Sequence, residues 1–199
     1  MNKHFDTLLK KVKNGKGDSD KHLLTLFSIS LSLNAKNILE LGVRNGDTSL
    51  PFLLCAEQTK GKVTSVDLKA TNFECPKELN QYWNFYEESA LDFLEAKFKN
   101  KEKYDIIYVD DWHSYDHVKK ELEYIDALTS PGSLVLLHDL MYGNTCPYYH
   151  IDLTKCSPQW ANGGPYRAVA ELDQNFWEFS TIPCNNGLTI LRKKYSSRY

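Results

Sequence analysis

The sequence lacks several features that would point to common classes of protein. None of its 5 cysteines lies in a C-x-x-C pair, so a zinc site of the usual spacing is not expected, and the odd number favours a reducing compartment. No apolar run approaches the ~18 residues of a membrane-spanning helix, and the N-terminal residues lack an apolar signal core. We therefore expect a soluble, cytoplasmic protein without membrane contact.

The chain also lacks a marked excess of charge of either sign. Its 24 Lys and Arg residues nearly balance 26 Asp and Glu residues, which gives a net charge of −2. A nucleic-acid partner held by phosphate neutralisation is therefore not expected. The length of 199 residues, with 42% hydrophobic and 25% charged residues, predicts one globular domain over residues 1–199.

Apolar segments and helical patterns alternate along most of the chain. Strands are expected at 38–41, 62–68, 83–86, 106–109 and 131–139, and helices at 5–12, 21–33, 49–58, 89–100 and 114–128. Residues 177–183 and 187–194 read as a closing strand pair around an Asn-Gly turn. The pattern predicts an α/β fold: a doubly wound, mostly parallel sheet with an antiparallel closing strand.

Two segments stand apart from this alternation. Residues 1–34 are expected to form helices that precede the first strand. Residues 141–166 show no periodicity and are rich in tyrosine, proline and glycine. This segment is too long for an ordinary connection, so we expect an ordered lid there. A helix is expected to follow over residues 167–175.

Polar residues follow each of the expected parallel strands. They are Glu40 to Ser49, Asp67, Glu88 and Ser89, Asp110 to His113, and His138 and Asp139. In an open parallel sheet, ligands bind outside the carboxyl ends of the strands. One crevice should therefore collect these residues, and one ligand with several hydrogen-bond donors would explain their acids together.

The turn after the first strand, ELGVRNG, carries only two glycines, Gly42 and Gly46. A dinucleotide site needs G-x-G-x-x-G so that backbone amides can approach a pyrophosphate. Glu40 would repel such a group and suits a ligand that carries positive charge. An NAD-dependent oxidoreductase of similar fold is thus disfavoured, although the two glycines could also serve the turn alone.

The stretch ILELGVRNGDTS, with Asp67 at the end of the second strand, resembles the class I S-adenosylmethionine-dependent methyltransferases. The nearest likeness is to the small macrocin and catechol O-methyltransferase types of methyltransferase family 24. The resemblance implies a Rossmann-like fold in which Asp67 accepts hydrogen bonds from the ribose hydroxyls of S-adenosylmethionine. It implies further cofactor contacts by Glu40, Gly42, Arg44, Gly46, Ser49, Glu88, Ser89, Asp110 and Trp112.

The resemblance also implies catalytic roles for Asp110, His113 and Asp139. Asp110 and Asp139 would bind Mg²⁺ or another divalent cation, and His113 would take the proton of the acceptor. The catechol type has an asparagine after the second metal-binding aspartate, where this chain has Leu140, which cannot coordinate. His138 is the expected third ligand, with Asn144 or another lid residue as the alternative.

Structural readings stay open for some of these residues. Asp111 could only cap the following helix, Trp112 could wall the adenine pocket or fill the core, and His113 and His138 could be structural. We expect methylation of a hydroxyl on a small molecule or sugar. The alternatives are a cofactor-binding module without catalytic activity and a protein of similar fold that belongs with those named hydroxylases. The sequence leaves open whether the chain forms a homodimer.

Overall fold

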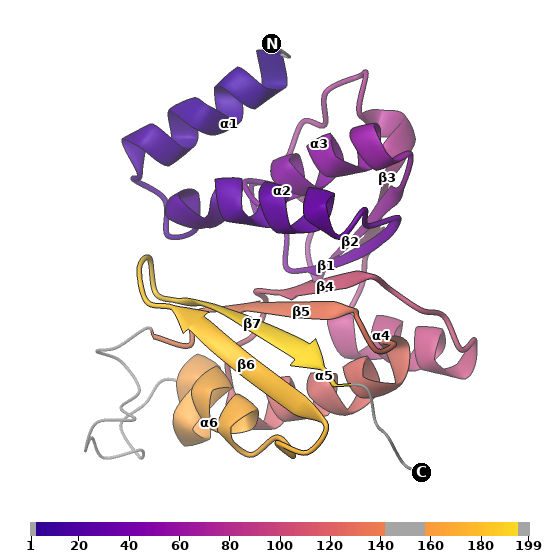
Figure 1. Cartoon of the computed structure of the whole chain (residues 1–199), viewed down its shortest axis with the longest axis vertical. Coiled ribbons are helices and arrows are strands. Elements are labelled where there is room, and N and C mark those ends of the chain that lie inside the picture. The colour runs from indigo at the N-terminus through magenta and orange to yellow at the C-terminus, as the bar shows by residue number, and fades with distance from the viewer. Residues whose placement is uncertain (1–2, 142–157, 195–199) are drawn as a thin grey trace.

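The fold is built on a seven-stranded sheet, in a computed structural model that describes residues 3–141 and 158–194 (Figure 1). The strand order is β3-β2-β1-β4-β5-β7-β6. The strands are β1 Asn37–Leu41, β2 Lys62–Asp67, β3 Trp83–Glu87, β4 Ile106–Val109, β5 Leu134–His138, β6 Trp177–Ile182 and β7 Leu188–Lys193. β7 runs antiparallel to β5 and β6, and the remaining pairs are parallel. The predicted doubly wound, mostly parallel sheet with an antiparallel strand is confirmed.

Helices cover both faces of the sheet (Figure 1). One face carries α1 Lys3–Asn14, α2 Leu23–Ser32 and α3 Ser49–Thr59, and the other carries α4 Ala90–Lys99, α5 Tyr115–Leu128 and α6 Gly164–Ala170. Short 3₁₀ turns span Asp20–His22, Asn80–Tyr82 and Pro158–Gly163. Within the described residues, no helix has the length and apolar composition that crossing a lipid bilayer requires.

The central strands are buried on both faces, as their continuous apolar runs predict. Leu39 and Ile107 point into the core under α4 and α5, whereas Ile38 and Ile106 point into the core under α2 and α3. Because side chains alternate along a strand, Glu40 follows Ile38 onto the α3 face. The polar residues begin at the carboxyl end of the sheet, and some of them, such as Glu40 and His138, are buried as well.

The helix expected over residues 167–175 was placed too late in the chain. α6 begins at Gly164, after Gly163 with φ of +93°, and Pro165 occupies its first turn, where no backbone N–H is needed. It ends at Ala170, and a turn before β6 follows in which the amide of Trp177 donates to the carbonyl oxygen of Asp173. Most of the predicted lid, residues 142–157 with Asn144, lies outside the described residues.

Candidate active site

The loop between β1 and α3 is fastened to the carboxylate of Asp67 at the end of β2. The backbone amides of Val43 and Arg44 donate to Asp67 Oδ2 at 2.8 and 3.0 Å, and the amide of Lys69 donates to Oδ1 at 3.1 Å. A carboxylate has about four lone-pair sites, two on each oxygen, so Oδ2 is fully used by the loop and Oδ1 keeps one site for a ligand. This loop and Asp67 therefore form one preorganised unit.

Gly42 and Gly46 are required by this loop rather than merely tolerated. Both have positive φ, +86° and +71°. A β-carbon at Gly42 would lie 2.1 Å from the carbonyl oxygen of Asp110, and one at Gly46 would lie 2.1 Å from the ring of Phe73. Because backbone cannot move aside as a flexible side chain can, Gly42 allows the β1 loop to touch the end of β4.

Glu40 supports the same loop from below. Its carboxylate is fully buried and accepts hydrogen bonds from the hydroxyls of Thr48, Ser49 and Ser65 at 2.8, 2.7 and 2.6 Å. Burial raises the pKa of Glu40 to about 7, although the three hydroxyl bonds oppose that rise. Both Glu40 and Ser49 thus have partners inside the protein, and their predicted contacts with a cofactor stay predictions.

A cavity of about 490 Å³, here called the Asp67 cavity, opens at the carboxyl ends of β1, β2 and β4. This volume lies within the range of about 300–1,000 Å³ that is usual for small-molecule sites. Its lining includes Gly42, Arg44, Asp67, Ser89, Asp110 and Trp112. Glu88 is exposed and does not line it, and its amide donates to the carbonyl oxygen of Asp67 at 3.0 Å.

A second cavity, of about 350 Å³, lies on the other side of Asp110 and is called the Asp139 cavity. Its lining includes Asp18, Asp110, His113, Asp139, Trp160 and Asn186. Arg44, Asp110 and Asp111 line both cavities. Asp67 and Ser89 therefore line one cavity, His113 and Asp139 line the other, and Asp110 lines both.

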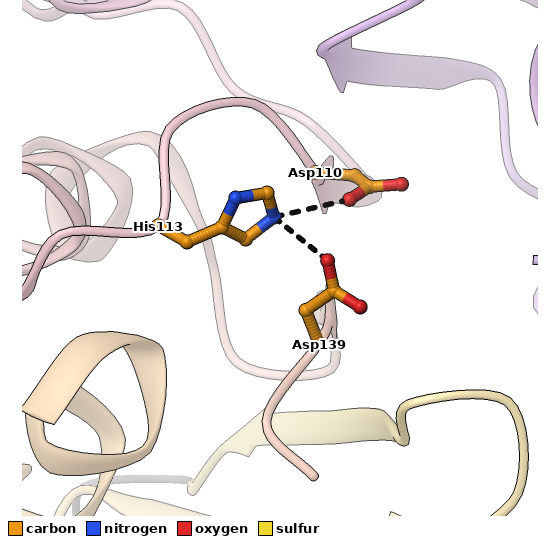
Figure 2. Close-up of side chains that lie close together, drawn as sticks. All are labelled: Asp110, His113 and Asp139. Atoms are coloured by element: carbon orange, nitrogen blue, oxygen red, sulfur yellow. Dashed lines mark hydrogen bonds and ion pairs between the residues drawn. The ribbon is translucent and has the colours of Figure 1, made fainter. Parts of the chain in front are cut away.

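Asp110, His113 and Asp139 lie together at the ends of β4 and β5 (Figure 2). His113 Nε2 is 3.4 Å from Asp110 Oδ1 and 3.0 Å from Asp139 Oδ2. One potential ligand atom from each of these residues lies within 4.8 Å of the other two. Asp139 Oδ1 is buried, and within the described residues its one near polar neighbour is His138 Nδ1 at 3.1 Å, in an ion pair without good hydrogen-bond geometry.

His138 lies behind this cluster and is 1% exposed. Its Nε2 lies 2.9 Å from the carbonyl oxygen of Asn185, which fixes that nitrogen as the donor. Its Nδ1 lies 3.1 Å from Asp139 Oδ1 and 3.5 Å from Asp110 Oδ1. The predicted third ligand therefore reaches both aspartates, but His113 does so as well. Leu140 is buried and carries no ligand atom.

The two carboxylates strongly favour protonated histidines. Burial alone would lower the pKa of His113, but hydrogen bonds and charge from Asp110 and Asp139 outweigh it and raise the pKa to about 9. Burial works against the same two partners at His138, whose pKa rises to about 11. Burial is likewise outweighed at Asp139, where the two histidines lower the carboxyl pKa. A cation bound by these carboxylates would instead lower the pKa of both histidines.

Three further residues that the sequence did not single out hold the cluster in place. Tyr108 donates from its hydroxyl to Asp110 Oδ2 at 3.0 Å, Gln159 Nε2 lies 3.1 Å from His113 Nδ1, and the Trp160 ring stacks on His113 at 4.5 Å between centroids. Tyr108 lies on β4, two residues before Asp110, and this spacing can be read from the sequence. Gln159 and Trp160 come from the segment predicted as a lid, but their contacts with His113 were not predicted.

The chain can now be compared with known proteins. A family model described as a methyltransferase domain matches residues 39–140, just over half of the chain. The match covers the β1 loop, Asp67 and the Asp110 to Asp139 cluster. No protein of curated function is similar enough in sequence to be matched to this chain.

Several solved structures share the fold at low sequence identity. The O-methyltransferase from Bacillus cereus, in complex with SAH, is 16% identical with a TM-score of 0.66, over 98% of this chain and 92% of that one. The O-methyltransferase TomG from Streptomyces achromogenes, in complex with SAM, is 14% identical with a TM-score of 0.67, over 98% and 91%. The MycE methyltransferase of mycinamycin biosynthesis, in complex with Mg, SAH and mycinamycin VI, is 15% identical with a TM-score of 0.59, over 82% and 46%. At these identities the likeness establishes the fold.

Proposed function

This chain belongs to the methyltransferase-domain family, and we propose that it transfers the methyl group of S-adenosylmethionine to a hydroxyl oxygen of a small molecule or sugar. The observation that carries the proposal is the position of Asp110, which lines both the Asp67 cavity and the Asp139 cavity. A methyl donor and an acceptor held in two such cavities would meet beside one carboxylate. Holding both reactants in this way removes much of the entropic cost of their encounter.

The residues of the Asp67 cavity fit S-adenosylmethionine. Asp67 Oδ1 can accept from a ribose hydroxyl while the loop bonds of Asp67 stay intact. Trp112, which lines the cavity and is 45% exposed, provides an apolar wall for an adenine ring. The Bacillus cereus and Streptomyces achromogenes enzymes, which share this fold, were solved with SAH and SAM, and this supports the same assignment here.

The Asp139 cavity offers a proton acceptor for the second substrate. S-adenosylmethionine supplies, when bound, an electrophilic methyl group, and a hydroxyl oxygen takes that group readily only as its proton leaves. Asp110 and Asp139 alone favour a protonated His113, but a cation bound to these carboxylates would favour the neutral imidazole, whose Nε2 could then take the proton of the acceptor. Stacking on Trp160 and the contact with Gln159 hold the ring in that orientation.

We further propose that Asp110 and Asp139 hold a divalent cation, which would be Mg²⁺ if only oxygen ligands bind it and Mn²⁺ or Fe²⁺ if His113 or His138 also coordinates it. The fit rests on the donor set, since the carboxylates of Asp110 and Asp139 and the imidazole of His113 bring one potential ligand atom each within 4.8 Å of one another. The cation would stabilise negative charge on the acceptor oxygen. Magnesium in the structure of MycE, a distant relative in fold, is consistent with this role.

Calorimetry with S-adenosylmethionine, in the presence and absence of Mg²⁺, tests the proposal most directly. We expect binding under both conditions, because the Asp67 cavity and the Asp110–Asp139 cluster use different residues apart from Asp110. Absence of binding under both conditions would refute the assignment of the cofactor. Binding that Mg²⁺ leaves unchanged, even when a hydroxyl acceptor is present, would remove the metal from the proposal and leave the cofactor in it.

A further inference from the structure

A second cluster of potential metal ligands lies beside the first, on the opposite side of the chain that leaves β4. His117 Nε2 is 3.0 Å from Asp111 Oδ2 and 3.5 Å from Glu121 Oε1. One ligand atom from each of these residues lies within 4.8 Å of the other two. His117 and Glu121 are four residues apart on α5 and therefore share a face of the helix.

Glu121 is the feature of this cluster that the fold leaves unexplained. Its side chain is 0% exposed, and within residues 3–141 and 158–194 neither of its carboxylate oxygens has a hydrogen-bond partner, with His117 Nε2 as an ion-pair neighbour at 3.5 Å. Asp111 Oδ1 is also buried and makes no hydrogen bond with the described residues. A buried carboxylate without hydrogen bonds is costly unless a cation compensates it. Burial and the neighbouring charge of Asp111 accordingly raise the pKa of Glu121 to about 8.

We propose that Asp111, His117 and Glu121 form a second metal site, which binds a first-row divalent transition-metal ion such as Zn²⁺. Ligand atoms about 2.1 Å from such an ion, at tetrahedral angles, lie roughly 3.4 Å apart. The observed separations of 3.0 and 3.5 Å match that spacing. An imidazole among the donors selects transition metals over Mg²⁺ and Ca²⁺, which prefer oxygen ligands alone.

The site is open to ligands from one side. Asp111 and His117 line the Asp67 cavity, whereas Glu121 lies beneath them in the core. An ion could therefore enter through this cavity, and positions not filled by protein would face it. Because Asp111 belongs to the turn that carries Asp110 and His113, the ion would fasten this turn to α5. The site does not depend on the proposed methyl transfer.

The competing explanation is that a protonated His117 is the counter-ion of the two carboxylates. Burial lowers the pKa of His117, but Asp111 and Glu121 outweigh burial and raise it to about 10, so an imidazolium could fill this role without a metal. The two explanations differ in their response to added Zn²⁺. A metal site binds the ion and releases the proton of His117, whereas an ion pair between His117 and the carboxylates binds no Zn²⁺.

Metal content distinguishes them. Protein carrying Asp139→Asn, which weakens the first cluster, is stripped with a chelator, equilibrated with Zn²⁺ and analysed by mass spectrometry for bound zinc. We expect about one equivalent of zinc per chain. Adding Glu121→Gln should weaken Zn²⁺ binding by at least about tenfold, since the loss of a residue that only supports a metal ligand already lowers metal affinity by that factor. Glu123→Gln is the matched control, because Glu123 is exposed and paired with Lys120. Equal zinc in all three proteins would overturn the proposal.

Should Glu121→Gln fail to fold, the unmodified chain still decides the question. The ¹⁵N resonance of His117 Nε2 is followed while Zn²⁺ is added, and coordination should shift it strongly as the bound proton is lost. An unchanged resonance at saturating Zn²⁺ would overturn the proposal. Binding of S-adenosylmethionine is measured separately, so failure of the cofactor assignment and failure of this site are distinguishable.

Discussion

Gly42 and the carbonyl oxygen of Asp110 are so close that a β-carbon on Gly42 would lie 2.1 Å from that oxygen. This contact joins two parts of the site. One is the β1 loop, which carries the amides bonded to Asp67, and the other is Asp110, which lines both cavities. The relative position of the two proposed substrates therefore depends on the absence of a side chain at residue 42.

Gly42→Ala should both destabilise the protein and weaken the binding of S-adenosylmethionine. The positive φ alone costs about 1–2 kcal/mol for a residue with a β-carbon, and the collision with backbone adds to it. We expect a lower unfolding temperature and a dissociation constant raised about tenfold or more, which corresponds to roughly 1.4 kcal/mol. Thermal unfolding and calorimetry measure the two effects.

Gly15→Ala is the matched control for that substitution. Gly15 also has a positive φ, of +53°, but its β-carbon would meet only the flexible end of Lys21. This variant should show the backbone strain without the loss of cofactor binding. If Gly42→Ala and Gly15→Ala bind S-adenosylmethionine equally well, the contact between Gly42 and Asp110 does not position the cofactor.

Asp67→Ala and Asp110→Ala should affect different steps. Asp67 is expected to hold the ribose, and hydrogen bonds to a charged group contribute about 1.5–3 kcal/mol, so Asp67→Ala should raise the dissociation constant at least tenfold. Asp110→Ala should mainly lower kcat, measured with a hydroxyl acceptor found by screening. The reverse pattern, with binding lost in Asp110→Ala and turnover lost in Asp67→Ala, would mean that the two cavities are assigned the wrong way round.

The residues of the Asp110–Asp139 cluster could be predicted from sequence because of a general property of parallel sheets. Their carboxyl ends meet at one edge, so Asp67, Asp110 and Asp139, each at a strand end, had to lie near one another. The direction of each side chain could not be predicted. Asp110 and Asp111 are neighbours in sequence, yet they point into different clusters, and only the path of the chain after β4 decides which.

Other features depend on contacts between distant segments. The stacking of Trp160 on His113 joins residues that are 47 positions apart, and no periodic pattern announces it. The helical spacing of His117 and Glu121 is visible in sequence, but the complete burial of Glu121 is not, because it results from packing around α5. Glu40 was expected to face a ligand, whereas Thr48, Ser49 and Ser65 surround it.

Asp139→Asn should abolish the response of the protein to Mg²⁺. Asp139 has φ of +66°, a conformation that asparagine tolerates well, so the backbone should be preserved while one carboxylate is lost. We expect Mg²⁺ to raise the unfolding temperature of the unmodified protein and to leave that of the variant unchanged. Glu121→Gln should retain the response, since its cluster is proposed to prefer transition metals. A full Mg²⁺ response in Asp139→Asn would exclude this residue as a ligand.

Glu40→Gln should change how stability depends on pH. The pKa of Glu40 is raised from 4.5 to about 7, so the native state holds a proton that the unfolded state releases. Its contribution to the free energy of unfolding is complete below pH 4.5 and is lost as pH rises through 7. The loss for one group is on the order of 3–4 kcal/mol, from about 1.4 kcal/mol for each pKa unit between 4.5 and about 7.

Glutamine cannot ionise, yet its carbonyl oxygen can still accept from the hydroxyls of Ser49 and Ser65. The variant should therefore gain stability relative to the unmodified protein as pH rises from 5 to 8, even if it is less stable at pH 5. Denaturant unfolding of both proteins at several pH values measures this difference. Two parallel profiles would mean that Glu40 ionises equally easily in the native and unfolded states, and that its three hydroxyl partners compensate fully for its burial.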